Sequence, residues 1–225
     1  NRIRKILLTA SGGPFRGYTR KQLEKVTLQD ALRHPTWNMG HKVTIDSSTM
    51  VNKGLELIEA RWLFDVEVDE IEVLVQPQSI LHSAVEFMDG AVMAELGTPD
   101  MKLPIQYALY YPKRKKLAGS KRLDLAALGK LDFSAPDFKA FPGLKLAYHA
   151  GRLGGRLPTV LNAANEVAVR AFLDEKISYL QIASCIEDAM EQHEKVGLLG
   201  SPAVSDILAL QKSTEAWLKA RYHLA

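Results

Sequence analysis

Residues 46–62 read DSSTMVNKGLELIEARW, and this stretch has the pattern of an amphipathic helix. Apolar side chains recur at the i, i+4, i+7 and i+11 positions of one helix face, at Val51, Leu55, Ile58 and Trp62. Either Ser47 or Ser48 is expected to cap the helix, because a serine hydroxyl accepts a hydrogen bond from a free N–H of the first turn. We therefore expect this helix to bury one face in a core.

A polar stripe lies beside the apolar one, formed by Asn52, Glu56 and Glu59, with Lys53 about a quarter turn away. A solvated face with Glu–Lys pairing explains such a stripe. A binding site is the alternative, because helix N-termini favour phosphate and carboxylates are ligands for Mg²⁺ or Mn²⁺. Two carboxylates do not complete an octahedral site, so water, a substrate or other residues would have to supply the remaining ligands.

The composition is that of a globular protein. The 225 residues are 47% hydrophobic and 24% charged, which suits one or two domains with a real core. The net charge of +3 is too small to indicate nucleic-acid binding. Cys185 is the single cysteine, so no internal disulfide is possible, and we interpret it as a small core residue of a protein from a reducing compartment. No apolar run approaches the roughly 20 residues of a membrane span, and no signal-peptide pattern opens the chain.

The first half of the chain alternates between strand and helix patterns. Residues 6–10 predict a buried strand, the Gly-rich SGGPF a loop, and residues 27–33 a short helix that ends before Pro35. The loop HPTWNMGHK follows, and residues 43–46 predict a strand. Residues 70–75 alternate with period two, and residues 79–96 predict a hairpin that turns at Asp89–Gly90.

The second half is expected to be helical. After a helix over 104–110, residues 111–136 have the pattern of a crossing linker, in which the basic run KRKK is a solvated loop. Four helical patterns then follow with short connections, over 143–153, 158–175, 178–195 and 202–222. We expect an α+β fold, in which a catalytic domain with a mixed or antiparallel sheet spans 1–110, a linker spans 111–136, and a four-helix bundle spans 137–225.

Further polar residues are candidates for chemistry. The SGG segment at 11–13 follows a strand, and its small residues would let backbone N–H groups approach an anion. His34 adjoins the loop that carries Trp37 and Met39 and is a candidate for substrate contact, whereas His82 has the pattern of a satisfied core histidine. No histidine pair has the spacing of a helical zinc site. The remaining candidates are Asn162, Asn165 and Glu166. They form either a second site or buried hydrogen bonds between helices.

Five motifs in one order identify a family. They are LLTASGGPFR, HPTWNMGHKVTIDSSTMVNKGLELIEARWLF, QPQSILHS, LGTPDMKLPI and LNAANEVAV. Over essentially all of its length the chain resembles 1-deoxy-D-xylulose 5-phosphate reductoisomerases. This family has an NADPH-binding domain, a catalytic domain and a C-terminal four-helix domain, and the chain resembles the last two. The resemblance, and a start at NRIRKILLTA without Met, imply a piece of a longer protein that lacks the dinucleotide domain and the family's Asp-x-Glu metal motif.

The resemblance also implies roles for individual residues. It implies that the substrate phosphate is held by Ser11, Ser47, Asn52 and Lys53. Glu56 is implied as a metal ligand that also contacts the substrate, with Glu59 and His82 close to the site. The mobile flap that closes over the substrate is implied to carry His34, Trp37 and Met39, with Lys42 positioning it. The residues implied to lie near the NADPH nicotinamide are Met39, Gly97, Pro99 and Met101.

The activity implied by the resemblance is the isomerisation and reduction of 1-deoxy-D-xylulose 5-phosphate to 2-C-methyl-D-erythritol 4-phosphate. NADPH and Mg²⁺ or Mn²⁺ are the implied cofactors, a homodimer the implied assembly, and the bacterial cytoplasm or plastid stroma the implied location. No nucleic-acid or membrane partner is expected. Without the missing parts the chain is expected to be inactive alone. A non-catalytic phospho-sugar-binding module is the alternative. A helical protein-interaction domain is a third interpretation, which predicts an exposed apolar patch and no role for Lys53.

Overall fold

A computed structural model describes residues 2–37, 39–194 and 202–224 of the chain. The chain divides into two compact units. One comprises Asn1–Ser11 and Glu72–Ala135, and the other comprises Gly12–Ile71 and Pro136–Ala225. Each unit therefore combines segments that are far apart in the sequence. The predicted division at residues 110 and 136 stays a prediction, since compact units and functional domains need not coincide.

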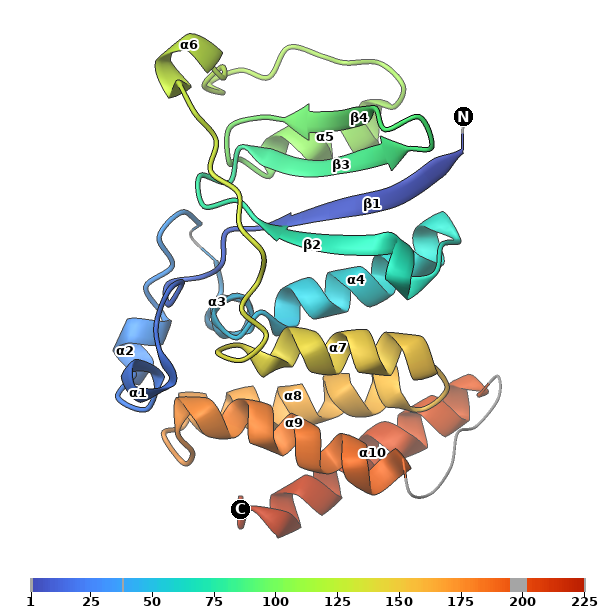
Figure 1. The fold of residues 1–225 in the computed structure, drawn as a ribbon. Helices are drawn as coiled ribbons and strands as arrows, with labels where there is room; N and C mark the ends of the chain where they lie inside the picture. The colour runs from blue at the N-terminus through green and yellow to red at the C-terminus, as the bar shows by residue number, and fades with distance from the viewer. Residues whose placement is uncertain (1, 38, 195–201, 225) are drawn as a thin grey trace. The chain divides into compact units, whose positions relative to one another are not determined.

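A four-stranded sheet dominates the first unit. Its strands are β1 (Ile3–Ala10), β2 (Ile71–Val75), β3 (Leu81–Phe87) and β4 (Val92–Leu96), in the order β2-β1-β3-β4 (Figure 1). β3 pairs antiparallel with both β1 and β4. The predicted strands at 6–10 and 70–75 and the hairpin over 79–96 are confirmed, and β2 buries alternate residues as its period-two pattern requires. The α+β class is therefore correct.

One edge of this unit is apolar and uncovered within the unit. β4 is an edge strand, and all five of its residues are exposed. Helix α5 (Lys102–Tyr110) follows it and buries none of its residues. It begins two residues before the predicted helix at 104–110. The linker region that follows contains the short helix α6 (Leu125–Leu128) and an isolated bridge from Ser134 to Val75.

The second unit is helical. Its elements are α1 (Arg20–Leu23), α2 (Leu28–Ala31), α3 (His41–Ser48), α4 (Val51–Phe64), η1 (Val68–Glu70), α7 (Pro142–Leu153), α8 (Leu157–Leu173), α9 (Tyr179–Glu194) and α10 (Val204–Arg221) (Figure 1). The predicted helix at 27–33 and the four C-terminal helices are confirmed, although residue 195, the predicted end of the third, lies outside the described residues. Among the described helices, none combines the length and apolar character of a membrane span.

The core of this unit is built around α8. Eleven of its 17 residues are buried, and it packs against α7, α9 and α10. Large apolar side chains such as Leu161 on α8 and Ile182 and Ile186 on α9 are completely buried. Each contributes about 1.5–3 kcal/mol relative to an exposed side chain. Cys185 is buried in the same core as expected, and burial raises the pKa of its thiol to about 11.

The predicted strand at residues 43–46 is wrong, because these residues lie within α3. A run of four residues cannot distinguish a strand from a buried helical segment by periodicity. The helix is favoured locally because the Thr44 hydroxyl and backbone N–H both donate to the Gly40 carbonyl, at 2.9 and 3.0 Å. It is favoured by packing because Ile45 is completely buried.

The predicted start of the quoted helix is also wrong, and its predicted buried face is only partly correct. Ser47 and Ser48 are the last residues of α3, and α4 begins only at Val51. Trp62 is 72% exposed. The buried face includes Val51 as predicted, but its other members are Gly54, Leu57 and Ala60. Hydropathy patterns give small residues little weight, but here they allow close helix packing. A Cβ atom on Gly54 would lie 2.3 Å from the Ala147 Cβ of α7.

Candidate active site

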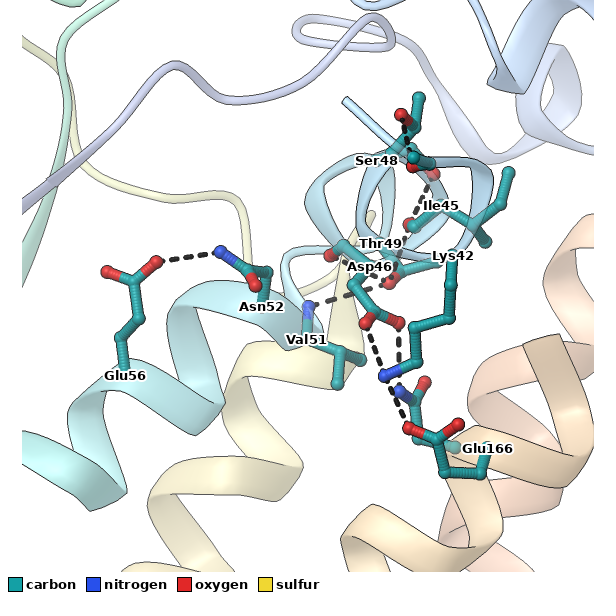
Figure 2. A network of polar contacts seen from close by, with 12 residues as sticks. Lys42, Ile45, Asp46, Ser48, Thr49, Val51, Asn52, Glu56 and Glu166 are labelled. Atoms are coloured by element: carbon teal, nitrogen blue, oxygen red, sulfur yellow. Dashed lines mark hydrogen bonds and ion pairs between the residues drawn. The ribbon is translucent and has the colours of Figure 1, made fainter. Parts of the chain in front are cut away.

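The polar stripe of α4 forms a compact cluster. The Glu56 carboxylate accepts a hydrogen bond from the Asn52 amide at 2.7 Å (Figure 2) and one from the Lys53 ammonium at 2.5 Å. The i, i+4 and i, i+3 spacings place both donors above the same carboxylate. The Lys53 side chain is only 14% exposed. The expected Glu–Lys pairing is therefore present, but its lysine is largely withdrawn from solvent.

A sharp turn joins α3 to α4 and sets the position of this cluster. Met50 has φ of 61°, in the left-handed region, although it is neither glycine nor asparagine. This conformation costs roughly 1–2 kcal/mol, and burial of the Met50 side chain offsets the cost. The turn places Ser47, near the end of α3, shortly before Asn52 and Lys53 in the first turn of α4. Three of the four predicted phosphate-binding residues therefore lie around one bend.

The Gly-rich loop meets the same bend. Gly13 has φ of +66°, and a Cβ atom there would lie 3.0 Å from both the Ser47 carbonyl oxygen and the Ser48 Cα. Glycine is thus required by both the backbone conformation and the close approach. The loop therefore packs against the C-terminal turn of α3, as a shared anion site requires. Ser11, the fourth predicted phosphate ligand, is the last residue of its segment of the first unit.

The predicted flap is the loop between α2 and α3. Trp37 and Met39 are both half-buried. His34 orders the loop, because its Nδ1 atom accepts hydrogen bonds from the N–H groups of Thr36 at 3.2 Å and Trp37 at 2.9 Å. An acceptor Nδ1 carries no proton, so the neutral ring is the tautomer protonated on Nε2. The donor of the neutral His34 ring is therefore its Nε2 atom.

The His34 geometry predicts a pH dependence. Burial lowers the pKa of His34 below its ordinary value of 6.5, so folding favours the neutral ring. The contribution of His34 to stability is complete above pH 6.5 and is lost as the pH falls through the lower folded pKa. In an NMR titration we expect the ring to titrate below 6.5 and the Thr36 and Trp37 amides to shift with the same midpoint. A ring that titrates above 6.5 would contradict the effect of burial, and amides that do not follow the ring would contradict the Nδ1 acceptor.

The structure explains one of the three polar candidates Asn162, Asn165 and Glu166. The Asn165 amide donates to the Asp46 carboxylate across 2.8 Å, and both side chains are buried. Asn162 and Glu166 are exposed. Of the two explanations left open by the sequence, hydrogen bonding between buried helices is therefore confirmed for Asn165.

The remaining predicted residues lie in the first unit. The His82 Nε2 atom lies 3.2 Å from the Gly97 carbonyl oxygen, so these two positions are brought together. Gly97 also packs against Leu103. Met101, at the start of α5, is exposed. The predicted proximity of Gly97, Pro99 and Met101 to a nicotinamide stays a prediction.

Glu56 does not form a metal site with this chain's described residues alone. Both of its oxygens are engaged by Asn52 and Lys53. Over residues 2–37, 39–194 and 202–224, no group of three or more His, Cys, Asp or Glu side chains is arranged to hold an ion. Glu59 is exposed one turn further along α4. The donor set thus does not fit a divalent cation without ligands from elsewhere.

One structural contact near the site has no signal in the sequence. The Tyr179 hydroxyl of α9 donates to the Ser48 carbonyl oxygen over 2.7 Å. Burial raises the pKa of this tyrosine, so the hydroxyl keeps its proton. A residue 131 positions away therefore holds the bend that carries the candidate phosphate ligands.

Known proteins resemble this chain in both structure and sequence. Solved structures resemble this chain over 99% of its length. One DOX-P reductoisomerase, solved with NADPH, fosmidomycin and magnesium, is 45% identical with a TM-score of 0.93, and the match covers 56% of that chain. The enzyme from Zymomonas mobilis, solved with NADPH, is 42% identical with a TM-score of 0.89, and again 56% of that chain is covered.

Sequence comparisons give the same result. The 1-deoxy-D-xylulose 5-phosphate reductoisomerase of Lachnospira eligens is 60% identical over 220 residues, which are 98% of this chain and 57% of the relative. That of Bacillus subtilis is 53% identical over 218 residues, 97% of this chain and 56% of the relative. The chain thus spans little more than half the length of these relatives.

Family models match both halves of the chain. The DXP reductoisomerase C-terminal domain matches residues 96–217, and the 1-deoxy-D-xylulose 5-phosphate reductoisomerase C-terminal domain matches residues 1–64. The second match contains the Gly-rich loop, the flap loop and the polar cluster of α4, while the first contains α7, α8, α9 and most of α10. The chain belongs to the 1-deoxy-D-xylulose 5-phosphate reductoisomerase family.

Proposed function

We propose that this chain forms the substrate-binding part and the C-terminal helical part of a 1-deoxy-D-xylulose 5-phosphate reductoisomerase. The cluster of Asn52, Lys53 and Glu56, on a bend shared with Ser47, is the observation that carries this proposal. An amide, an ammonium and a hydroxyl are donors suited to a phosphate group. Binding the phosphate, which does not react, supplies orientation for the carbons that do.

Phosphate binding would change the state of Glu56. Without a ligand, Asn52 and Lys53 both donate to its carboxylate. A phosphate with two negative charges is a stronger acceptor and would draw these donors away. The Glu56 oxygens would then be free for other partners. This exchange gives Glu56 two roles, as a counter-charge that keeps Lys53 in place before binding and as a ligand afterwards.

The cofactors and the flap complete the proposal. A divalent cation, when bound, supplies Lewis-acid stabilisation of charge on the substrate oxygens. Glu56 is the carboxylate of this chain that we assign to it. His34 would donate from Nε2 to the substrate, while Trp37 and Met39 exclude water as the loop closes. In the first unit, Gly97 and Met101 are the residues that we assign to contact with NADPH. The bacterial relatives favour a bacterial rather than a plastid source.

A non-catalytic phospho-sugar-binding module is the second candidate. It is supported by the α4 cluster, in which Asn52 and Lys53 are phosphate donors supplied by this chain alone. A chimera that joins this chain to the N-terminal segment of the L. eligens relative distinguishes the two functions. We expect the chimera to oxidise NADPH in the presence of the phosphosugar and Mn²⁺, and its Lys53→Ala variant to do so far more slowly. A folded chimera that binds NADPH and the phosphosugar without oxidising NADPH would contradict the enzymatic role.

We also propose that two copies of the chain associate through the first unit. Its edge strand β4 and helix α5 expose apolar side chains that include Met93 and Leu109. An uncovered edge strand with this composition is normally protected by a partner. A second copy would extend the sheet across an isologous interface.

Light scattering tests this assembly. We expect the wild-type chain to have twice the mass of a single 25.0 kDa chain. Met93→Lys should shift it towards the monomer, because a charged side chain on an edge strand opposes pairing. Leu208→Glu on α10 is the matched control, since Leu208 is similarly exposed but lies in the second unit. A monomeric wild type, or equal dissociation in both variants, would contradict the proposed interface.

A further inference from the structure

Helix α3 carries a carboxylate that is almost completely buried. The Asp46 side chain is 2% exposed, and Lys42, one turn earlier on the same helix, places its ammonium 2.6 Å from one carboxylate oxygen (Figure 2). The other oxygen accepts the Asn165 hydrogen bond from α8. Burial raises the pKa of Asp46, while Lys42 and Asn165 oppose this effect by stabilising the ionised form. The Lys42 ammonium therefore offsets part of the cost of burying the ionised Asp46 carboxylate.

The same ammonium also reaches a second helix. Lys42 Nζ lies 2.6 Å from a carboxylate oxygen of Glu166 on α8 (Figure 2). Burial lowers the pKa of Lys42, but its hydrogen bonds and charge interactions with Asp46 and Glu166 outweigh burial, and the pKa is raised. Lys42 thus stays charged at neutral pH and joins α3 to α8. Because two carboxylates already engage it, Lys42 is poorly placed to act as a substrate ligand.

The position of Lys42 along the chain gives this bridge its consequence. Lys42 is the second residue of α3, directly after the flap loop that carries His34, Trp37 and Met39. The first turn of α3 is closed by two hydrogen bonds from Thr44 to Gly40. Whatever holds Lys42 therefore holds the C-terminal end of this loop.

We propose that Lys42 is a positioning residue whose bridge between Asp46 and Glu166 fixes the hinge of the flap on α8. Through this bridge, α8 holds the end of the loop that closes over the substrate in the proposed function. The anchoring of the loop rests on the contacts of Lys42 alone. Its effect on the reaction rests on the proposed function. The inner pair with Asp46 is buried and maintains the fold. The outer pair with Glu166, which is 46% exposed, should affect the hinge more than the fold.

Hydrogen exchange of the first turn of α3 tests the anchor directly in the free chain. We expect Glu166→Gln to raise exchange there about two- to fivefold, the range that a half-exposed ion pair supports. Asp174→Asn is the matched control. It breaks the Arg170–Asp174 pair, whose carboxylate is 37% exposed, and leaves both members of the Lys42–Glu166 pair in place. Lys42→Met should raise exchange further, and Lys42→Arg should restore it, because a guanidinium can also bridge two carboxylates.

Ligand affinity distinguishes positioning from a general loss of structure. Glu166→Gln should weaken binding of the phosphosugar, which the flap contacts, and leave binding of inorganic phosphate unchanged. Equal exchange in Glu166→Gln and Asp174→Asn, or equal weakening of both ligands, would overturn the proposal. If the wild-type chain binds neither ligand, the proposed function fails, and the increase in exchange specific to Glu166→Gln and Lys42→Met still supports the anchor.

Discussion

Lys53→Ala is expected to weaken binding of 1-deoxy-D-xylulose 5-phosphate roughly 10- to 100-fold, which corresponds to the loss of one hydrogen bond between charged groups. The Lys53 side chain is mostly buried, and its ammonium is already oriented by Glu56 at 2.5 Å. Little conformational entropy is therefore lost when the phosphate replaces or joins that carboxylate. Titration calorimetry of the wild-type and variant chains measures the difference.

The control for this prediction is Lys145→Ala on α7. Lys145 is exposed, so its removal lowers the net charge equally without touching the cluster. We expect its affinity for the phosphosugar to match that of the wild type. Thermal unfolding of Lys53→Ala should remain within about 1 kcal/mol of wild type, because the Glu56 carboxylate left behind is 39% exposed and still accepts from Asn52. Equal affinity in Lys53→Ala and wild type would refute the phosphate assignment.

Gly54→Ala is expected to lower the free energy of unfolding by roughly 2–3 kcal/mol, at the upper end of the range for an overpacked core. The new Cβ would lie 2.3 Å from the Ala147 Cβ, far inside the normal carbon–carbon distance. The helices α4 and α7 must therefore separate. The loss exceeds the helix propensity that alanine gains over glycine, about 1 kcal/mol. Denaturant unfolding followed by circular dichroism measures it.

A second substitution tests whether this contact is the cause. Gly54→Ala combined with Ala147→Gly removes the clash and should recover most of the stability, less the cost of the new glycine. Gly40→Ala is the matched control, because a Cβ atom at Gly40 would have no atom of the described residues within 4 Å. It should change stability by less than about 1 kcal/mol. A failure of the double variant to recover would mean that another effect of Gly54 dominates.

The sequence predicts the long elements of this fold well and short ones less well. The helix α8 and the hairpin of β3 and β4 carry enough periodic residues, and turn signals at their ends, to be recognised. Residues 43–46 are too short a run to show a period. The buried face of α4 was misassigned because Gly54 and Ala60 pack by being small, a property that hydropathy does not measure.

The candidate site could also be predicted only in part from the sequence. Asn52, Lys53 and Glu56 could be placed together from the sequence, because helical spacing alone brings them onto one face. The bend at Met50 and the bridge from Lys42 to Glu166 could not. The first depends on a left-handed residue that is not glycine. The second joins residues 124 positions apart, on helices whose approach is decided by packing in the core.

An NMR titration of the isotope-labelled chain with the phosphosugar tests the central claim most directly. We predict that the amides of Ser47, Asn52 and Lys53 shift together and saturate at one concentration, and that inorganic phosphate shifts the same amides more weakly. Saturable shifts confined to other parts of the chain, with these three unchanged, would contradict the assignment of the α3–α4 bend as the phosphate site.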